Sequence, residues 1–127
     1  VIEVEGKPQR ISPEHLREEI TAPRVLFKTK SFPNPYQWND DFSALSPTLV
    51  KYLAQKGVIL IGIDTPSVDP SNDKELLSHT EIFQNNMAIL EGIILDTVKP
   101  GEYNLIALPL PIEGADASPV RAILLPL

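Results

Sequence analysis

The chain has 127 residues, of which 43% are hydrophobic, and this composition suits one folded domain with a real core. Its net charge of −6 at pH 7 argues against nucleic acid and membrane surfaces as partners, since phosphate binding needs clustered Lys and Arg. The lack of cysteine excludes disulfides and thiolate metal ligands and leaves oxygen and imidazole donors for any metal. A cytoplasmic location is the default expectation.

The first half of the chain alternates predicted strands and helices. Strands are predicted at Val1 to Val4, Arg24 to Thr29 and Val58 to Ile63. One helix is predicted to begin after Ser12 and to continue to Ile20, and another begins after Ser46 and ends at Gly57 in a left-handed cap. Because the strand at Val58 to Ile63 is apolar on both faces, it is predicted to be a central strand of a parallel α/β sheet, covered on each side.

The second half is less regular. It contains a predicted short helix and three predicted strands, at Asp73 to Phe83, Gly92 to Leu95, Tyr103 to Leu110 and Val120 to Leu125. Prolines within or beside the last strands confine them to sheet edges or interruptions. In the first half of the chain, after the strand predicted at Arg24 to Thr29, Ser31 to Asp41 is an aromatic, proline-rich loop without periodicity.

Motifs of the second half carry a resemblance to a known family. They are Gly62-Ile-Asp-Thr-Pro-Ser-Val-Asp-Pro70, then His79, Ile89-Leu-Glu-Gly-Ile-Ile-Leu-Asp96, Leu105-Ile-Ala-Leu-Pro-Leu110 and Asp116-Ala-Ser-Pro-Val-Arg-Ala122. With these motifs the chain resembles the C-terminal part of bacterial kynurenine formamidases, of the cyclase-like family of metal-dependent hydrolases. The resemblance implies a layered β/β/α fold of the swivelling-domain type, with a parallel central sheet and a second, antiparallel sheet.

The family's N-terminal motif is missing from this sequence. Family members carry His-x-Gly-Thr-His-x-Asp-x-Pro, which supplies most of their metal ligands, whereas the two histidines here are His15 and His79. We therefore expect residues 1–127 to form the C-terminal portion of a single cyclase-like hydrolase domain, with the N-terminal ligand segment outside this chain.

The resemblance implies two metal ligands in this chain, His79 and Glu91, because the family's ligand histidine stands twelve residues before the glutamate of Ile-Leu-Glu. The alternative for His79 is a loop histidine hydrogen-bonded to backbone. The alternative for Glu91 is a salt bridge to Arg121 or a lysine, because a carboxylate among apolar residues is nearly always paired or coordinated. Thr80 stands where many relatives have a second histidine. The contact that this imidazole makes in those relatives is therefore not implied for this chain.

A substrate pocket is expected where the central strand ends, because ligands of open α/β sheets bind at the carboxyl ends of strands. The candidate pocket residues are Asp64, Thr65, Ser67, Asp69 and Trp38. Asp64 could orient a ligand histidine, or form a turn that caps the loop before Pro66. Trp38 could line an aromatic pocket or a subunit contact, although packing is the commoner role of such a residue. His15 is predicted to be a solvated surface residue.

The resemblance implies hydrolysis of N-formylkynurenine to kynurenine and formate in tryptophan catabolism. It also implies zinc, as one or two divalent ions, and a homodimer. We expect the aromatic loop to form part of the dimer contact. No proton donor to the leaving aniline nitrogen is assigned in this chain, since that residue is expected on the absent segment. Two alternatives remain: a related hydrolase of another small aromatic or cyclic amide, and a catalytically silent fragment or partner subunit.

Overall fold

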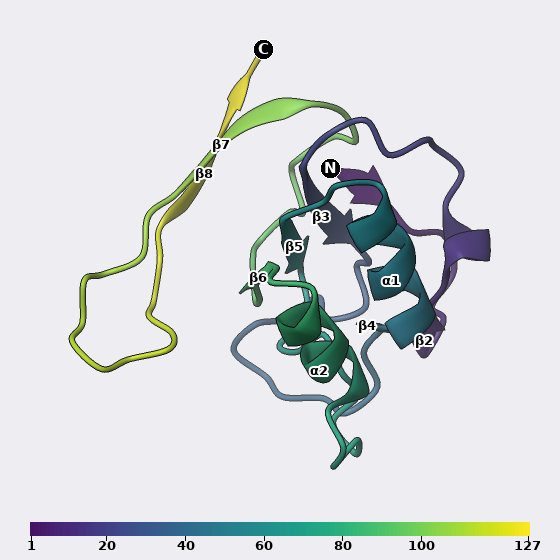
Figure 1. Ribbon diagram of the computed structural model, residues 1–127. Coiled ribbons are helices and arrows are strands. Elements are labelled where there is room, and N and C mark those ends of the chain that lie inside the picture. Colours follow the sequence, from purple (N-terminus) through teal and green to yellow (C-terminus); the bar gives the residue numbers. More distant parts are fainter.

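Eight strands form three sheets in the computed structural model, which describes all residues, 1–127 (Figure 1). The central sheet is parallel in the order β1-β3-β5-β6, and its strands are β1 (Ile2–Glu3), β3 (Arg24–Lys28), β5 (Leu60–Ile63) and β6 (Ala88–Leu90). A short parallel pair joins β2 (Arg10–Ile11) to β4 (Ala44–Leu45), and an antiparallel pair joins β7 (Tyr103–Ala107) to β8 (Ala122–Pro126). The helices are η1 (Pro13–His15), a 3₁₀ turn, α1 (Pro47–Gln55) and α2 (Leu77–Gln84).

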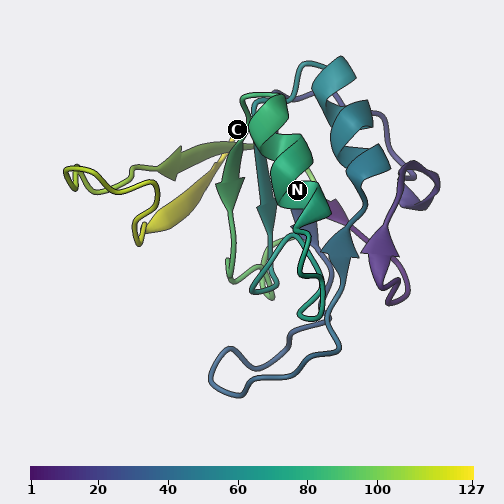
Figure 2. The same cartoon turned by 60° about the horizontal axis from the view of Figure 1, so that its bottom comes forward.

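The two faces of the central sheet pack against different layers of the fold. Val25 and Phe27 of β3 belong to the main core, whereas Leu26 between them belongs to a separate cluster. The main core includes the helix side chains Leu49, Val50, Leu53 and Ile82. The second cluster is packed against side chains of the β7–β8 pair, among them Leu105 and Leu124. Helices therefore cover one face and the antiparallel pair covers the other, as Figure 2 shows, which confirms the predicted β/β/α layering with β5 inside the sheet.

Helix α1 follows the predicted capping signals. Its N-cap, Ser46, accepts a hydrogen bond on Oγ from the backbone N–H of Leu49 at 3.1 Å, and Pro47 occupies the first turn, where no N–H is needed. Gly57 follows the helix with φ of 80°, a left-handed conformation that glycine adopts without strain. The helix and its cap are therefore confirmed.

Gly62 sets the spacing between β5 and the layer below it. A Cβ atom at this position would lie 2.3 Å from Cδ2 of Leu26 and 3.2 Å from Cδ1 of Ile93. Both atoms belong to the face that packs against β7 and β8. The absence of a side chain at Gly62 therefore lets the neighbouring apolar groups close over the strand.

The β7–β8 pair extends from the body as an arm (Figure 1). With two strands the arm has two unpaired edges, in agreement with the predicted edge strands. Its side chains alternate: Leu105 and Leu124 pack on the body, while Ile106 and Ile123 are exposed by 42% and 43%. None of the helices is both long enough and apolar enough to traverse a bilayer.

Three details differ from the sequence expectations. The helix expected from Ser12 to Ile20 is the single 3₁₀ turn η1, which the extended conformation of Leu16 ends. The strand expected at Gly92 to Leu95 is wrong, because Gly92 has φ of 64° and its N–H bonds to Thr65 in a loop; β6 lies just before it. The β2–β4 pair was not expected, since two-residue strands leave no periodic pattern.

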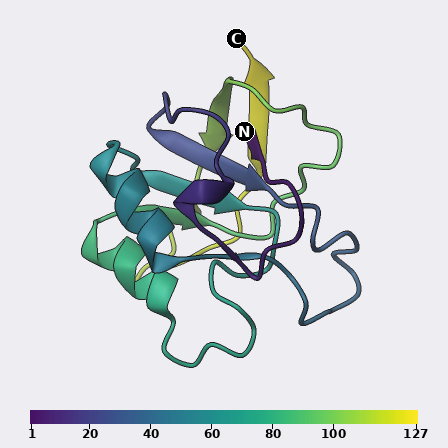
Figure 3. The same cartoon turned by 90° about the vertical axis from the view of Figure 1, so that its right-hand side faces the viewer.

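Loop 31–42 projects on the side away from the helices, as Figure 3 shows.

Candidate metal site

Two of the predicted site residues meet at the carboxyl ends of β5 and β6. His79 lies in the first turn of α2, the helix that connects these two strands, and Glu91 directly follows β6. Nε2 of His79 lies 3.4 Å from Oε1 of Glu91, and the two side chains are 32% and 30% exposed. The two side chains predicted as ligands therefore lie close together. Their role as metal ligands stays a prediction.

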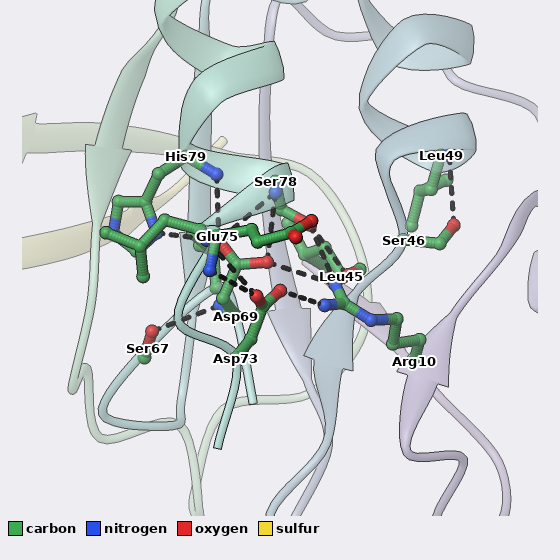
Figure 4. Close-up of polar contacts among 12 residues, drawn as sticks. Arg10, Leu45, Ser46, Leu49, Ser67, Asp69, Asp73, Glu75, Ser78 and His79 are labelled. Carbon is green, nitrogen blue, oxygen red and sulfur yellow. Dashed lines mark hydrogen bonds and ion pairs between the residues drawn. The ribbon is translucent and has the colours of Figure 1, made fainter. Parts of the chain in front are cut away.

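Asp69 lies beneath the imidazole of His79, as Figure 4 shows. Oδ2 of Asp69 accepts hydrogen bonds from Nδ1 of His79 at 2.8 Å and from the backbone N–H of His79 at 2.9 Å. The backbone N–H of Ser78 donates to Oδ1 at 2.9 Å. The side chain of Asp69 is fully buried. One carboxylate thus satisfies two N–H groups of the first turn of α2 and fixes the ring that this turn carries.

The Asp69 contact determines which ring nitrogen of His79 carries the proton. An ionised carboxylate can only accept hydrogen bonds, so Nδ1 must be the donor. In the neutral imidazole the lone pair then resides on Nε2, the nitrogen that faces Glu91. A histidine whose second nitrogen donates to a carboxylate, with its free nitrogen beside another carboxylate, has the arrangement of a metal-binding histidine.

The charge of Asp69 is stabilised despite its burial. Burial raises the pKa of this carboxyl, but hydrogen bonds from the backbone N–H groups of His79 and Ser78, from the His79 ring and from Arg10 outweigh it and lower the pKa to about 2. Asp69 is therefore ionised at any physiological pH. It acts as a fixed negative charge and a fixed acceptor under the imidazole.

The low pKa of Asp69 predicts acid sensitivity of the fold. An unfolded aspartate titrates near pH 3.8 and the folded one near 2, so the stabilisation is complete above pH 4 and is lost as the pH falls through 2. The contribution is up to about 2 kcal/mol. Urea unfolding of the protein and of Asp69→Ala, measured from pH 6 to pH 2, should show that the difference between them shrinks in this window. A constant difference would contradict this account of Asp69.

The Glu91 carboxylate is held by the loop that follows β5. Its Oε1 accepts a hydrogen bond from the backbone N–H of Val68 at 2.9 Å. Its one ion-pair partner is His79, so the alternative of a salt bridge to Arg121 or a lysine is not observed. The loop hydrogen bond positions the carboxylate and leaves its charge available toward the imidazole.

The other predicted pocket residues have structural contacts. Asp64 is not hydrogen-bonded to His79. It accepts hydrogen bonds from the backbone N–H groups of Thr29 and Lys30 at 2.8 and 2.9 Å and from the Thr29 hydroxyl. The orienting carboxylate is Asp69, five residues later in the same loop. Thr65 is buried and donates to the carbonyl of Ser67, whose hydroxyl accepts from the N–H of Asp69. A pocket role for these residues stays a prediction.

Trp38 belongs to an aromatic cluster at the projecting loop. Its ring packs edge-on against Phe32 and Phe42 with centroid separations of 6.0 and 5.9 Å, and it remains 61% exposed. Its indole N–H donates to Asp40. His15 is half-buried rather than fully solvated, and its Nδ1 accepts a hydrogen bond from the backbone N–H of Ser12.

Arg10 was not expected at the site. Its Nη1 donates to Oδ1 of Asp69 at 3.0 Å, and its Nη2 pairs with Asp73. These partners lie 59 and 63 residues away in the chain. No local pattern could have indicated the contact, since a lone arginine in a polar segment is usually solvated.

The donors present fit part of a divalent-metal site. An imidazole nitrogen and a carboxylate are ligands that zinc prefers, and the second nitrogen of the imidazole already has its carboxylate partner. No group of three or more His, Asp and Glu side chains in the chain has the spacing of a metal site. Since catalytic zinc generally takes three protein ligands, His79 and Glu91 would be two members of such a set.

Sequence comparison identifies relatives along nearly the whole chain. A family model described as "Putative cyclase" matches residues 1–70. The kynurenine formamidase of Bordetella petrii is 52% identical over 116 residues, which are 90% of this chain and 56% of that protein. The kynurenine formamidase of Bordetella pertussis is 49% identical over 126 residues, 98% of this chain and 60% of that protein. The chain thus spans little more than half the length of these relatives.

Comparison with solved structures also identifies relatives of this chain. One described as a "potential metal-dependent hydrolase with cyclase activity" superposes with a TM-score of 0.82 at 30% identity, covering 91% of this chain and 58% of the other. A "predicted metal-dependent hydrolase" from Bacillus stearothermophilus superposes with a TM-score of 0.76, also at 30% identity, covering 91% and 57%. With the family model matching more than half of its residues and the same layers found in these structures, the chain belongs to the cyclase family.

Proposed function

We propose that this chain is part of a metal-dependent amide hydrolase that converts N-formylkynurenine to kynurenine and formate. The observation that carries the proposal is the Asp69–His79–Glu91 arrangement, in which an oriented imidazole nitrogen lies beside a carboxylate. The 52% identity to a kynurenine formamidase supports the choice of substrate. The reaction belongs to tryptophan breakdown.

Zinc is the proposed metal, as one or two ions. His79 Nε2 and Glu91 would be two of its protein ligands, and the descriptions of the structural neighbours as metal-dependent hydrolases support a divalent ion. Such an ion would polarise the formyl oxygen and lower the pKa of a bound water to about 7.

The chain's own residues would prepare this chemistry. Asp69 holds the proton on Nδ1 of His79, so the other nitrogen stays free for the metal. The backbone N–H of Val68 holds Glu91 from the opposite side. Both donors are therefore fixed by hydrogen bonds before anything binds, which reduces the ordering cost of binding.

The remaining ligands are proposed to lie outside these 127 residues. This chain matches 56% and 60% of the length of two relatives, which supports reading it as a portion of one cyclase-like domain. We propose that it is the C-terminal portion. The substrate's aromatic ring would contact side chains of the projecting loop such as Trp38, which is 61% exposed.

A homodimer and a cytoplasmic location are part of the same proposal. Tyr36 and Trp38 are exposed by 97% and 61% on the projecting loop, and large exposed aromatic side chains are typical of protein interfaces.

A second candidate is a catalytically silent fragment or partner subunit. The observation that favours it is that this chain supplies two metal donors and no third. A related hydrolase that acts on another small aromatic or cyclic amide is the alternative within the enzyme class.

The test is hydrolysis of N-formylkynurenine by the purified native protein, with and without a chelator. We expect formate release that the chelator abolishes and added zinc restores, at a rate above that for a cyclic amide of similar size. Activity with the cyclic amide alone would favour the related hydrolase. A native subunit of about 127 residues without metal or activity would favour the silent subunit.

A further inference from the structure

Arg10 is the centre of a polar cluster beside the candidate metal site (Figure 4). It comes from β2, and its partners come from β4 and from the loop between β5 and α2. Nη1 donates to the carbonyl oxygen of Leu45 at 2.7 Å and to Oδ1 of Asp69 at 3.0 Å, and Nη2 pairs with Asp73. One guanidinium group therefore connects three segments that are far apart in the sequence.

The loop that Arg10 holds ends in a strained turn. Leu76, the residue before α2, has φ of 51° and ψ of 51°, a left-handed conformation that bulky residues rarely adopt. Oδ1 of Asp73 accepts hydrogen bonds from the backbone N–H groups of Glu75 and Leu76 at 2.9 and 3.2 Å. Such a conformation persists only where its surroundings determine it, and here Asp73 and its arginine partner do so.

This turn sets where α2 begins and where its first side chains point. The helix starts at Leu77, and the N–H groups of Ser78 and His79 donate to Asp69. Arg10 thus fixes two carboxylates of the loop, Asp69 directly under the imidazole and Asp73 at the turn. A shift of either carboxylate would move or rotate the ring of His79.

We propose that Arg10 is a positioning residue for His79, acting through Asp69 and the Asp73 turn. It holds the geometry in which Nδ1–H points to Asp69 and Nε2 points to Glu91. The importance of this geometry rests on the proposed function, in which Nε2 binds metal. The positioning itself is a property of the metal-free protein and can be tested there.

A lysine could not replace Arg10 in this role. The guanidinium is planar and presents five N–H donors, so it can hold two carboxylates and a carbonyl oxygen at fixed angles. An ammonium group is a single point on a flexible stem. It could neutralise Asp69, but it could not hold Asp73 and Leu45 at the same time.

The two histidines allow a direct measurement of the ring orientation. Nδ1 of His15 accepts a hydrogen bond from the backbone N–H of Ser12 at 3.0 Å, so its proton is on Nε2. Nδ1 of His79 donates to Asp69, so its proton is on Nδ1. Long-range ¹H–¹⁵N correlation spectra of the metal-free protein, recorded at a pH at which both imidazoles are neutral, should therefore show two opposite tautomers.

The variant Arg10→Met should change one of these histidines and leave the other. We expect the nitrogen shifts of His79 to converge as the Nδ1–H tautomer loses its dominance, while those of His15 stay unchanged. Arg24→Met is the matched control, because Arg24 is an exposed strand arginine without an ion pair. Unchanged His79 shifts in a folded Arg10→Met protein would overturn the proposal.

A second variant covers the case in which Arg10→Met does not fold. Arg10→Lys keeps the charge beside Asp69 and should give a partial shift of the His79 tautomer; an unchanged spectrum would overturn the proposal. In the native protein, zinc affinity should fall by about 10- to 100-fold in the same variants. A tautomer change without a change in zinc affinity would uphold the positioning by Arg10 and reject His79 as a ligand. Failure of this inference and failure of the proposed metal role of His79 therefore give different results.

Discussion

Replacement of Asp69 by asparagine is expected to destabilise the fold and to protonate Nε2 of His79, the nitrogen proposed to bind metal. Every group that contacts this carboxylate is a donor: Nη1 of Arg10, the backbone N–H groups of Ser78 and His79, and Nδ1 of the imidazole. An amide has one accepting oxygen and an NH₂ group, so a donor must face a donor in either orientation. With both oxygens buried, the cost is about 1 to 3 kcal/mol.

The amide also reverses the imidazole in one of these orientations. If the NH₂ group faces Nδ1, this nitrogen must accept, and the proton of the neutral ring moves to Nε2. A protonated Nε2 cannot bind metal, so zinc affinity should fall by at least about 10- to 100-fold. Urea unfolding and zinc competition with a chromogenic chelator measure the two effects. Asp116→Asn, at an exposed aspartate without an ion pair, is the control, and a variant of Asp69 that matched it in both measurements would refute this role.

Replacement of Glu91 by glutamine is expected to remove metal and activity while the fold remains. The glutamine keeps the shape of the side chain and a carbonyl oxygen that can accept from the N–H of Val68, so the loop contact survives. What disappears is the negative charge beside Nε2 of His79. Stability should change by no more than about 0.5 kcal/mol, as for most partly exposed positions.

Metal content and formamidase turnover of the native protein should fall together in Glu91→Gln. Both are measured on the same preparation, by elemental analysis and by formate release. Glu75→Gln is the matched control, because Glu75 is exposed near the start of α2 and makes no ion pair. Full metal occupancy with unchanged turnover would show that Glu91 is not a ligand.

Much of the fold follows from local sequence signals. Helix α1 has Ser46 at its start, Pro47 in its first turn and Gly57 after its end, and all three have the expected conformations. Strand β5 is apolar on both sides, and it lies inside the parallel sheet. These elements are predictable because their signals lie within the element itself.

The elements that were missed or predicted wrongly have a common physical cause. Strands β2 and β4 are two residues long, and their pairing depends on partners more than thirty residues away. Pro13 and Ser12 start a helical turn, but the extended backbone at Leu16 ends it after three residues. In each case tertiary contacts decide an outcome that local propensity leaves open.

The residues of the candidate site also include some with a local sequence signal and others without one. The spacing of His79 and Glu91 could be recognised because it is a fixed interval along one stretch of chain. The orienting aspartate could not be chosen, since Asp64 and Asp69 occupy one loop and only the path of that loop brings Asp69 beneath α2. Arg10 left no local signal, because its carboxylate partners follow it by 59 and 63 residues.

The long-range connection made by Arg10 has a consequence for the order of folding. Helix α1 and the β5–α2–β6 unit depend on contacts between neighbours in the chain, and such contacts form early because little loop entropy opposes them. The arginine must close a loop of about sixty residues before it reaches Asp69 and Asp73. We therefore expect the imidazole of His79 to acquire its final orientation late in folding, after helix α1 and the β5–α2–β6 unit have formed.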